Sequence, residues 1–209
     1  MAGDGSNERP FTRIQLRKRK VIFEAALEVF STYGARGATL EQIAQSAGMS
    51  KQNILYYFES KESIFVNLID ELIDLWIEPL GQIDGKGAPV DEILRYVQRK
   101  LEFSRDRPRE SRLFANEVLQ GAPNINHLIT GKLKTLVDEK AALFSSWALD
   151  GKIAHVDPYD LIFSIWATTQ HYADFSAQIS LISPHDPEQT FSRAELFLEQ
   201  LYRSLLEAV

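Results

Sequence analysis

Two short helical patterns on either side of a glycine occupy residues 39–58, and this segment constrains the fold more than any other. Thr39 is placed to cap the first helix, and Gln42 completes a capping box three residues later. Gly48 supplies the turn, and Ser50 is placed to cap the second helix. The sequence therefore predicts a helix-turn-helix.

The second helix of this segment has an apolar side and a polar side. Helical spacing predicts that Ile54, Leu55 and Phe58 point inward. A helix exposed only to solvent more often mixes Glu and Lys, whereas amides and tyrosines suit DNA base edges and phosphates. We expect Lys51, Gln52, Asn53 and Tyr56 to approach bases and Ser50, Tyr57 and Lys61 to hold phosphates, and the predicted DNA-binding set also includes Thr39. The alternative is that the two helices serve only packing.

A further helix is predicted on each side of the helix-turn-helix. The preceding one ends at Gly34 and packs behind the other two through Ile22, Ala25, Ala26, Val29, Phe30 and Tyr33. The following one begins at about Ser60 and carries Phe65, Leu68, Ile69, Leu72 and Trp76 on one side. Three helices of this kind make a small DNA-binding domain.

The motifs between residues 35 and 65 are Gly37-Ala-Thr, Ile43-Ala, Ala47-Gly, Ser50-Lys, Tyr56-Tyr57-Phe58 and Ser60-Lys61-Glu62. Together they resemble the TetR family of repressors. The resemblance implies an all-α fold with an N-terminal three-helix helix-turn-helix domain and a C-terminal helical ligand-binding and dimerisation domain. We expect a flexible N-terminal arm at 1–12, the DNA-binding domain at 13–60 and the second domain at 61–209.

The net charge of −6 is unevenly distributed along the 209 residues. Residues 1–62 hold nine Lys/Arg against seven Asp/Glu, and residues 63–209 hold fourteen against twenty-two, so the halves carry +2 and −8. Residues 9–23 contain six basic side chains and no acid. Positive charge at this edge favours contact with DNA phosphates, and the alternative is an ordinary solubilising surface.

Several classes of protein are disfavoured by what the sequence lacks. It has no cysteine, which excludes disulfides and thiolate metal sites. No apolar run approaches the ~20 residues needed to cross a bilayer, and no apolar leader precedes Arg9, so we expect a cytoplasmic protein. A phosphate-binding glycine loop, HExxH and G-x-S-x-G are absent, so we expect no enzyme and no cofactor. The histidines are too scattered for a local metal site, although His171 and Asp174 lie one turn apart.

The last two predicted helices, about 158–179 and 187–208, are apolar over wide arcs. A second chain that packs against these helices explains their wide apolar surfaces better than exposure to solvent does. A two-fold homodimer also places two recognition helices roughly 34–36 Å apart, which suits a palindromic operator. The family resemblance also implies dimerisation through a four-helix bundle, which is formed by the last two helices of each subunit. The alternative is a monomer whose final helices pack only against its own core.

The predicted helix after Pro158 places Trp166, Thr169 and Gln170 on one face. Gln170 offers both a donor and an acceptor, as a planar lactam or pyrimidine edge requires, and Trp166 with Trp76 supplies area for stacking. The alternative is that the tryptophans serve packing and Gln170 bonds to a neighbouring helix.

Residues 101–106, 112–114, 121–123, 133–134, 138–140 and 166–175 resemble the pyrimidine-utilisation repressor (RutR-like) branch of the TetR family. This resemblance implies uracil or thymine as the effector, bound near Trp76, Trp166 and Gln170. Two alternatives stay open. One is a TetR-family regulator that responds to an amino acid or an amine. The other is a helical protein-interaction module, which would leave the polar side of the recognition helix unused.

Overall fold

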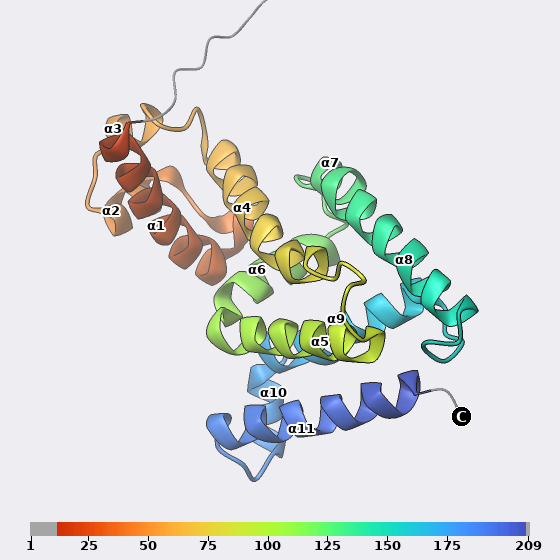
Figure 1. The fold of residues 1–209 in the computed structure, drawn as a ribbon. Helices are drawn as coiled ribbons and strands as arrows, with labels where there is room; N and C mark the ends of the chain where they lie inside the picture. Colours follow the sequence, from red (N-terminus) through yellow and green to blue (C-terminus); the bar gives the residue numbers. More distant parts are fainter. Residues whose placement is uncertain (1–11, 208–209) are drawn as a thin grey trace, which may run out of the picture. The chain divides into compact units, whose positions relative to one another are not determined.

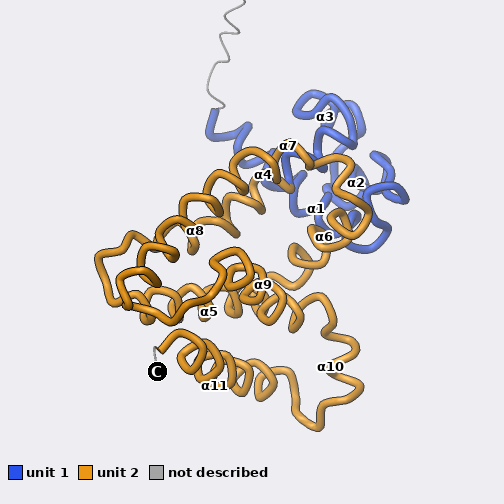
Figure 2. Tube along the Cα trace, turned by 90° about the vertical axis from the view of Figure 1, so that its right-hand side faces the viewer, with its two compact units in different colours: residues 1–68 blue, residues 69–209 orange. Residues whose placement is uncertain are grey.

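The computed structural model describes residues 12–207, and over this range the chain is helical without a strand (Figure 1). It divides into two compact units, Met1–Leu68 and Ile69–Val209 (Figure 2). The division falls inside α4 (Lys61–Gly81), which contributes residues to both units. None of the helices in the described range is long and apolar enough to cross a bilayer. The arm predicted at 1–12 lies outside the described residues except for Thr12, which caps α1.

Unit 1 contains α1 (Arg13–Gly37), α2 (Leu40–Ala47), α3 (Lys51–Leu55) and the start of α4. The helices enclose a small apolar core that includes Ile22, Phe30, Ile43, Ile54, Phe58 and Phe65. Gly34 is predicted to end the first helix, and the regular helical geometry does break there, at φ 70° and ψ 167°, before helical residues continue to Gly37. Glycine adopts this left-handed conformation without the steric cost that a Cβ imposes.

The predicted caps of the helix-turn-helix are confirmed. Thr39 Oγ1 accepts a bond from Gln42 N at 3.2 Å, and Gln42 Oε1 accepts from Thr39 N at 2.8 Å. Gly48 adopts φ 61° in the turn, and Ser50 Oγ accepts from Asn53 N at 3.2 Å. These bonds satisfy backbone N–H groups that have no partner within the helix itself.

The prediction that Leu55 points inward is wrong, because its side chain is 42% exposed. Successive helical residues point about 100° apart, so an inward Ile54 turns Leu55 outward. Phe58 still reaches the core because the chain tightens after α3, where the N–H groups of Tyr57 and Phe58 both donate to Ile54 O.

Unit 2 contains the rest of α4 and the elements α5 (Pro89–Asp106), α6 (Pro108–Leu119), α7 (Asn126–Leu128), η1 (Ile129–Leu133), α8 (Lys134–Leu149), α9 (Pro158–Asp174), α10 (Ser176–Ile182) and α11 (Pro187–Leu206). α5 packs against both α9 and α11 (Figure 1). Proline stands at the start of α5, α6, α9 and α11, where a missing N–H costs no helical bond. The buried face of α11 is Ala194, Leu198, Tyr202 and Leu206.

Residues 126–149 do not form one continuous α-helix. Residues 129–133 form a π turn, and Gly131 has φ −89° and ψ −108°. Lys132 Nζ holds this turn to α4, at 2.6 Å from Asp74 Oδ1 and 2.5 Å from Asp70 Oδ1. The predicted helix at 158–179 is likewise divided, because the regular pattern of α9 stops at Phe175.

The loop between α4 and α5 is organised by one buried carboxylate. Glu92 accepts hydrogen bonds from the backbone N–H groups of Asp84 at 3.0 Å, Gly85 at 3.2 Å and Gly87 at 2.6 Å. A Cβ at Gly87 would lie 3.0 Å from Glu92 Oε1. A side chain at position 87 would therefore have to displace the Glu92 carboxylate from its three hydrogen bonds.

Candidate functional site

α3 presents its polar residues to solvent. Lys51, Gln52, Asn53 and Tyr56 are exposed, whereas Tyr57 is half-buried and meets the ring of Tyr56 edge-on at 5.0 Å between centroids. Lys51 Nζ lies 2.6 Å from Glu41 Oε1, and the hydrogen bond from Lys51 lowers the pKa of that carboxyl. Because this ion pair is exposed, it contributes little to stability and leaves Lys51 free to exchange partners.

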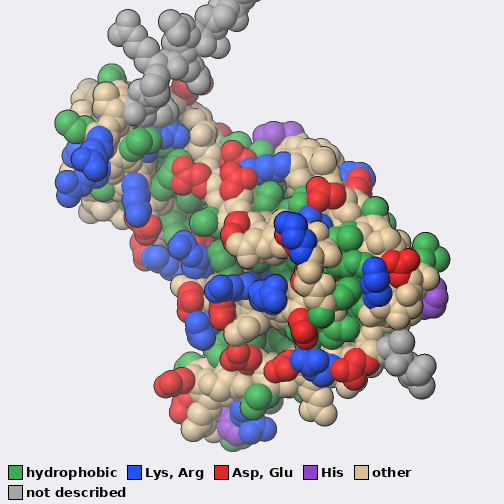
Figure 3. Space-filling view, viewed as in Figure 1, with side chains coloured by type: hydrophobic (Ala, Val, Ile, Leu, Met, Phe, Trp, Pro, Cys, Tyr) green, Lys and Arg blue, Asp and Glu red, His purple; other side chains and the backbone are tan. Residues whose placement is uncertain are grey.

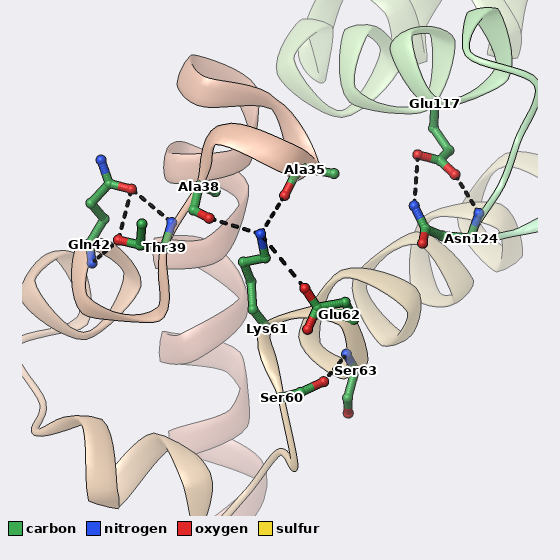
Figure 4. A network of polar contacts seen from close by, with 10 residues as sticks. All are labelled: Ala35, Ala38, Thr39, Gln42, Ser60, Lys61, Glu62, Ser63, Glu117 and Asn124. Atoms are coloured by element: carbon green, nitrogen blue, oxygen red, sulfur yellow. Dashed lines mark hydrogen bonds and ion pairs between the residues drawn. The ribbon is translucent and has the colours of Figure 1, made fainter.

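Lys61 has a different environment from the other predicted phosphate contacts. Its Nζ donates to the carbonyl oxygens of Ala35 at 2.8 Å and Ala38 at 2.9 Å, where α1 ends (Figure 4). Two of the three ammonium donors are thus used inside unit 1. Lys61 fixes the end of α1 against the start of α4, and it is the least available of the residues predicted to bind phosphate.

Arg19 is a unit 1 contact that the motif-based prediction missed. Its guanidinium lies 4.3 Å from the centroid of the Phe58 ring, and Nη1 donates to Tyr57 O at 3.3 Å. This contact fixes the chain just after α3, because the guanidinium contacts both the Tyr57 carbonyl and the ring of Phe58. The sequence signal for Arg19 was the run of basic residues before residue 23.

Figure 3 shows Lys and Arg gathered over unit 1 and mixed with Asp and Glu over unit 2.

Unit 2 contains a small cavity that Trp76 of α4, Trp166 of α9 and Gln170 of α9 line together. Tyr96 and Lys100 of α5 supply its other polar groups, and the remaining lining is aliphatic or aromatic. The space open to the centres of water molecules is about 30 Å³. A ring-shaped ligand therefore enters only if lining side chains move.

The two tryptophans of the cavity differ in their hydrogen bonds. Trp166 Nε1 donates to the Tyr96 hydroxyl at 2.6 Å. Trp76 Nε1 is buried and has no acceptor among the described residues. The Trp76 ring is held by edge contacts, with centroids 4.3 Å from Phe114 and 5.6 Å from Phe103. Its N–H is thus a fixed donor without a partner.

Lys100 is a cavity residue that sequence reasoning missed. It is only 4% exposed, and its Nζ lies 4.8 Å from the centroid of the Trp76 ring. Burial lowers the pKa of Lys100 to about 8, although the charge of Asp174 opposes this shift. Burial likewise raises the pKa of Asp174, whose Oδ1 accepts a bond from Ser111 Oγ at 2.7 Å. The sequence signal for a buried Lys100 was its position in the apolar stripe of α5, seven residues after Ile93.

An apolar surface runs along α11 beside its buried face. The residues Leu196, Phe197, Leu201 and Leu205 are exposed, Leu196 by 70% and Phe197 by 59%. Phe163 of α9 is exposed as well. Phe197, Leu201 and Leu205 recur every four residues, so they share one helical face. A contiguous apolar face of this kind is typical of a protein interface.

His171 and Asp174, considered for a metal site, have other neighbours. The His171 ring stacks on Phe175, with centroids 5.0 Å apart, and Asp174 bonds to Ser111. In the part of the chain that the structure describes, His, Asp and Glu form no group of three that could hold a metal ion.

The two units correspond to two known families. Residues 22–68 match the family described as bacterial regulatory proteins, tetR family, and residues 69–208 match the family described as YcdC-like protein, C-terminal region. The HTH-type transcriptional regulator RutR of Escherichia coli (strain K12) is 49% identical over 166 residues, which are 79% of this chain and 78% of RutR. The repressor NicS of Pseudomonas putida is 39% identical over 56 residues, 27% of this chain and 26% of NicS.

Solved structures resemble the fold as well. A transcriptional regulator of Streptomyces coelicolor, SCO4942, aligns with a TM-score of 0.72 and 23% identity, covering 90% of this chain and 98% of that one. AibR in complex with isovaleryl coenzyme A and operator DNA aligns with a TM-score of 0.69 and 18% identity, covering 92% and 100%. At these identities the likeness concerns the fold alone.

Proposed function

Because the chain belongs to the TetR family of bacterial transcriptional regulators, we propose that it is a homodimeric repressor whose effector is a pyrimidine base, uracil or thymine. It binds a palindromic operator in the cytoplasm and releases it when the effector occupies the cavity of unit 2. Binding rather than chemistry carries this activity, so the proposal requires no catalytic residue and no cofactor.

The DNA contact is assigned to the exposed side of α3. Gln52 and Asn53 are the base-reading residues, because a side-chain amide can donate to adenine N7 and accept from adenine N6 in the major groove. Lys51 and Tyr56 approach neighbouring bases. Phosphates are held by Ser50 and Tyr57, with Thr39 at the start of α2 as a further contact. Lys61 serves mainly to fix the start of α4, since α1 carbonyls already occupy its ammonium.

The observation that carries the effector proposal is the meeting of Trp76, Trp166 and Gln170 at one cavity. Indole rings provide faces for stacking, and the amide of Gln170 matches the alternating donor and acceptor edge of a pyrimidine. α4 contributes Trp76 to this cavity and also contributes residues 61–68 to unit 1. A ligand that prefers one position of α4 would therefore change the DNA-binding equilibrium, at a typical coupling of roughly 1–3 kcal/mol.

Dimerisation is assigned to α9 and α11, on the exposed apolar face that includes Phe197, Leu201 and Leu205. Burying these side chains against a second copy removes apolar surface from water and is favourable by roughly 25 cal/mol per Å². A two-fold axis through this face repeats the recognition helix, and the operator then carries the same two-fold symmetry.

The test is a titration of full-length protein onto a palindromic DNA fragment selected from a random pool, with and without uracil. We expect uracil and thymine to release the DNA. Gln170→Ala should bind DNA but lose the response to uracil, because an unmatched amide or imide edge costs roughly 1–3 kcal/mol. Thr168→Ala, on the same helix but outside the cavity lining, is the matched control.

Two other results would change the assignment. DNA release by an amino acid or an amine, with no effect of any pyrimidine, would favour a different metabolite and leave the repressor function standing. Failure to enrich any DNA sequence from the pool would favour a protein-interaction module instead.

A further inference from the structure

Two hydrogen-bond donors in the cavity lack acceptors within residues 12–207. Trp76 is 8% exposed and its Nε1 is buried without a partner. Lys100 Nζ faces the Trp76 ring at 4.8 Å, and no described side chain or carbonyl hydrogen-bonds to it. A buried donor such as the Trp76 N–H is normally paired, because an unpaired one loses its bonds to water without replacement.

Comparison with similar residues shows that this is a property of the cavity. Lys140 of α8 is as deeply buried as Lys100, yet its Nζ lies 2.7 Å from Glu139 Oε1. The other indole of the cavity, that of Trp166, donates its N–H to the hydroxyl of Tyr96. Asp174, whose charge acts on Lys100, has one carboxylate oxygen bonded to Ser111. Lys100 and Trp76 therefore both present hydrogen-bond donors at the cavity.

We propose that Lys100 and the Trp76 indole N–H recognise oxygen acceptors of the effector, so that the site selects planar rings bearing carbonyl oxygens and rejects amines. This inference rests on the proposed function for the place of binding, and it narrows the class of ligand. An ammonium attracts a carbonyl oxygen or an anion and repels a protonated amine. A ligand N–H in the same position would face two donors and leave all of them unpaired.

The proposal makes a specific distinction among pyrimidines. Uracil carries two carbonyl oxygens, whereas cytosine carries an amino group in place of one of them. Sites built around buried hydrogen-bonding groups discriminate strongly against a ligand with the wrong group, since the unpaired site group is penalised as well. Lys100 and Trp76 thus act as specificity-determining residues, while Gln170 reads the remaining edge.

The test is calorimetric titration of the full-length protein and three variants with uracil, cytosine, a set of small carboxylic acids and a set of small amines. Lys100→Met removes the ammonium and keeps an unbranched stem that ends at the same Cε position. Trp76→Phe removes the N–H and keeps an aromatic ring. Lys140→Met removes an equally buried lysine outside the cavity and is the matched control. Circular dichroism establishes that each variant is folded before it is titrated.

We expect wild-type protein to bind uracil and not the amines. Loss of a charge-assisted hydrogen bond should weaken uracil binding roughly 10- to 100-fold in Lys100→Met, with a smaller loss in Trp76→Phe and none in Lys140→Met. Discrimination between uracil and cytosine should shrink in Lys100→Met, which a merely structural lysine would not cause.

The remaining outcomes separate this inference from the proposed effector. If no pyrimidine binds but carboxylic acids bind in a manner that Lys100→Met abolishes, the pyrimidine proposal fails and the role of Lys100 stands. Wild-type binding of amines, or unchanged uracil affinity in Lys100→Met, overturns the role of Lys100 and leaves the pyrimidine proposal intact. Binding by no member of the panel overturns both.

Discussion

The indole nitrogen of Trp166 donates a 2.6 Å hydrogen bond to the hydroxyl of Tyr96, and this bond joins α9 to α5 at the wall of the cavity. Tyr96 is buried, and burial raises the pKa of its phenol while the bond from Trp166 opposes the rise. The phenol therefore stays neutral across the physiological range, and its oxygen accepts the indole proton without carrying a charge.

Removing this hydroxyl should destabilise unit 2. Tyr96→Phe leaves the Trp166 N–H without its acceptor at a partly buried site, which costs roughly 1–3 kcal/mol in the free energy of unfolding. Urea denaturation of the full chain measures the change. Tyr33→Phe is the control, because Tyr33 lies on the surface of α1 and its substitution should be nearly neutral. Equal stability of the two variants would show that the Trp166–Tyr96 bond contributes nothing net.

The buried Lys100 should make stability depend on pH. Burial lowers its pKa from 10.5 to about 8 in the folded chain, so between these values the unfolded chain binds more protons. By linkage, the free energy of unfolding then rises with pH across this window. The penalty for burying the charge is present in full below about pH 8 and is relieved as the pH approaches 10.5.

Lys100→Met should flatten that rise, by an amount on the order of a few kcal/mol since one pKa unit corresponds to about 1.4 kcal/mol. Urea denaturation of wild type and variant at several pH values between 8 and 10 gives the difference, and the titration of tyrosines in the unfolded chain cancels in the comparison. Parallel curves for the two proteins would contradict a depressed pKa of Lys100.

Base-reading and phosphate-binding residues of the helix-turn-helix should differ in their effect on DNA. Gln52→Ala or Asn53→Ala should change which base is preferred, with roughly 1–3 kcal/mol lost at the affected position. Tyr57→Phe, which removes a hydroxyl assigned to a phosphate, should weaken binding to operator and random DNA more evenly. Fluorescence anisotropy with single-base operator variants distinguishes them. Unaltered sequence preference in both amide variants would exclude α3 as the reading helix.

Lys61→Met should reduce the stability of unit 1, because its two hydrogen bonds to the carbonyls of Ala35 and Ala38 are lost. A hydrogen bond to a charged group contributes roughly 1.5–3 kcal/mol to stability. The loss of two such bonds should therefore be measurable by thermal unfolding. Lys18→Met, at an exposed position of α1, is the control. Wild-type stability together with weaker binding to every DNA would instead restore the phosphate role expected from the sequence.

The exposed apolar face of α11 should be required for assembly. A charge at Leu201 would have to be buried in the proposed interface, so Leu201→Lys should give a folded monomer with much weaker operator affinity. Sedimentation velocity measures the assembly. Ser192→Lys adds the same charge on the opposite side of α11 and should remain dimeric. Truncating α11 is less informative, since Ala194, Leu198, Tyr202 and Leu206 belong to the core of unit 2.

Local signals allowed much of the fold to be predicted. Caps at Thr39 and Ser50, and the proline at the start of α9, answer local chemical requirements of a helix end and depend on few distant residues. The π turn at Gly131 was not predictable in this way. It depends on Lys132 reaching Asp70 and Asp74, residues about sixty positions earlier in the chain.

The cavity could be predicted only in part. Trp166 and Gln170 share one helical face, which the spacing alone requires, and Trp76 was named with them for its stacking area and then by the family resemblance. Lys100 escaped notice because a single lysine in an amphipathic helix usually reaches solvent along its aliphatic stem. Its burial follows from the packing of α5 against α9, and that packing is a property of the tertiary structure.

Glu92 and Gly87 depend on each other in the loop between α4 and α5. A side chain at position 87 would push against the carboxylate, and a shorter residue at position 92 would strand three backbone N–H groups. A change at either position therefore disturbs the contact with the other. Anyone who transplants this connection into another helical scaffold has to carry both residues across together, with the spacing between them unaltered.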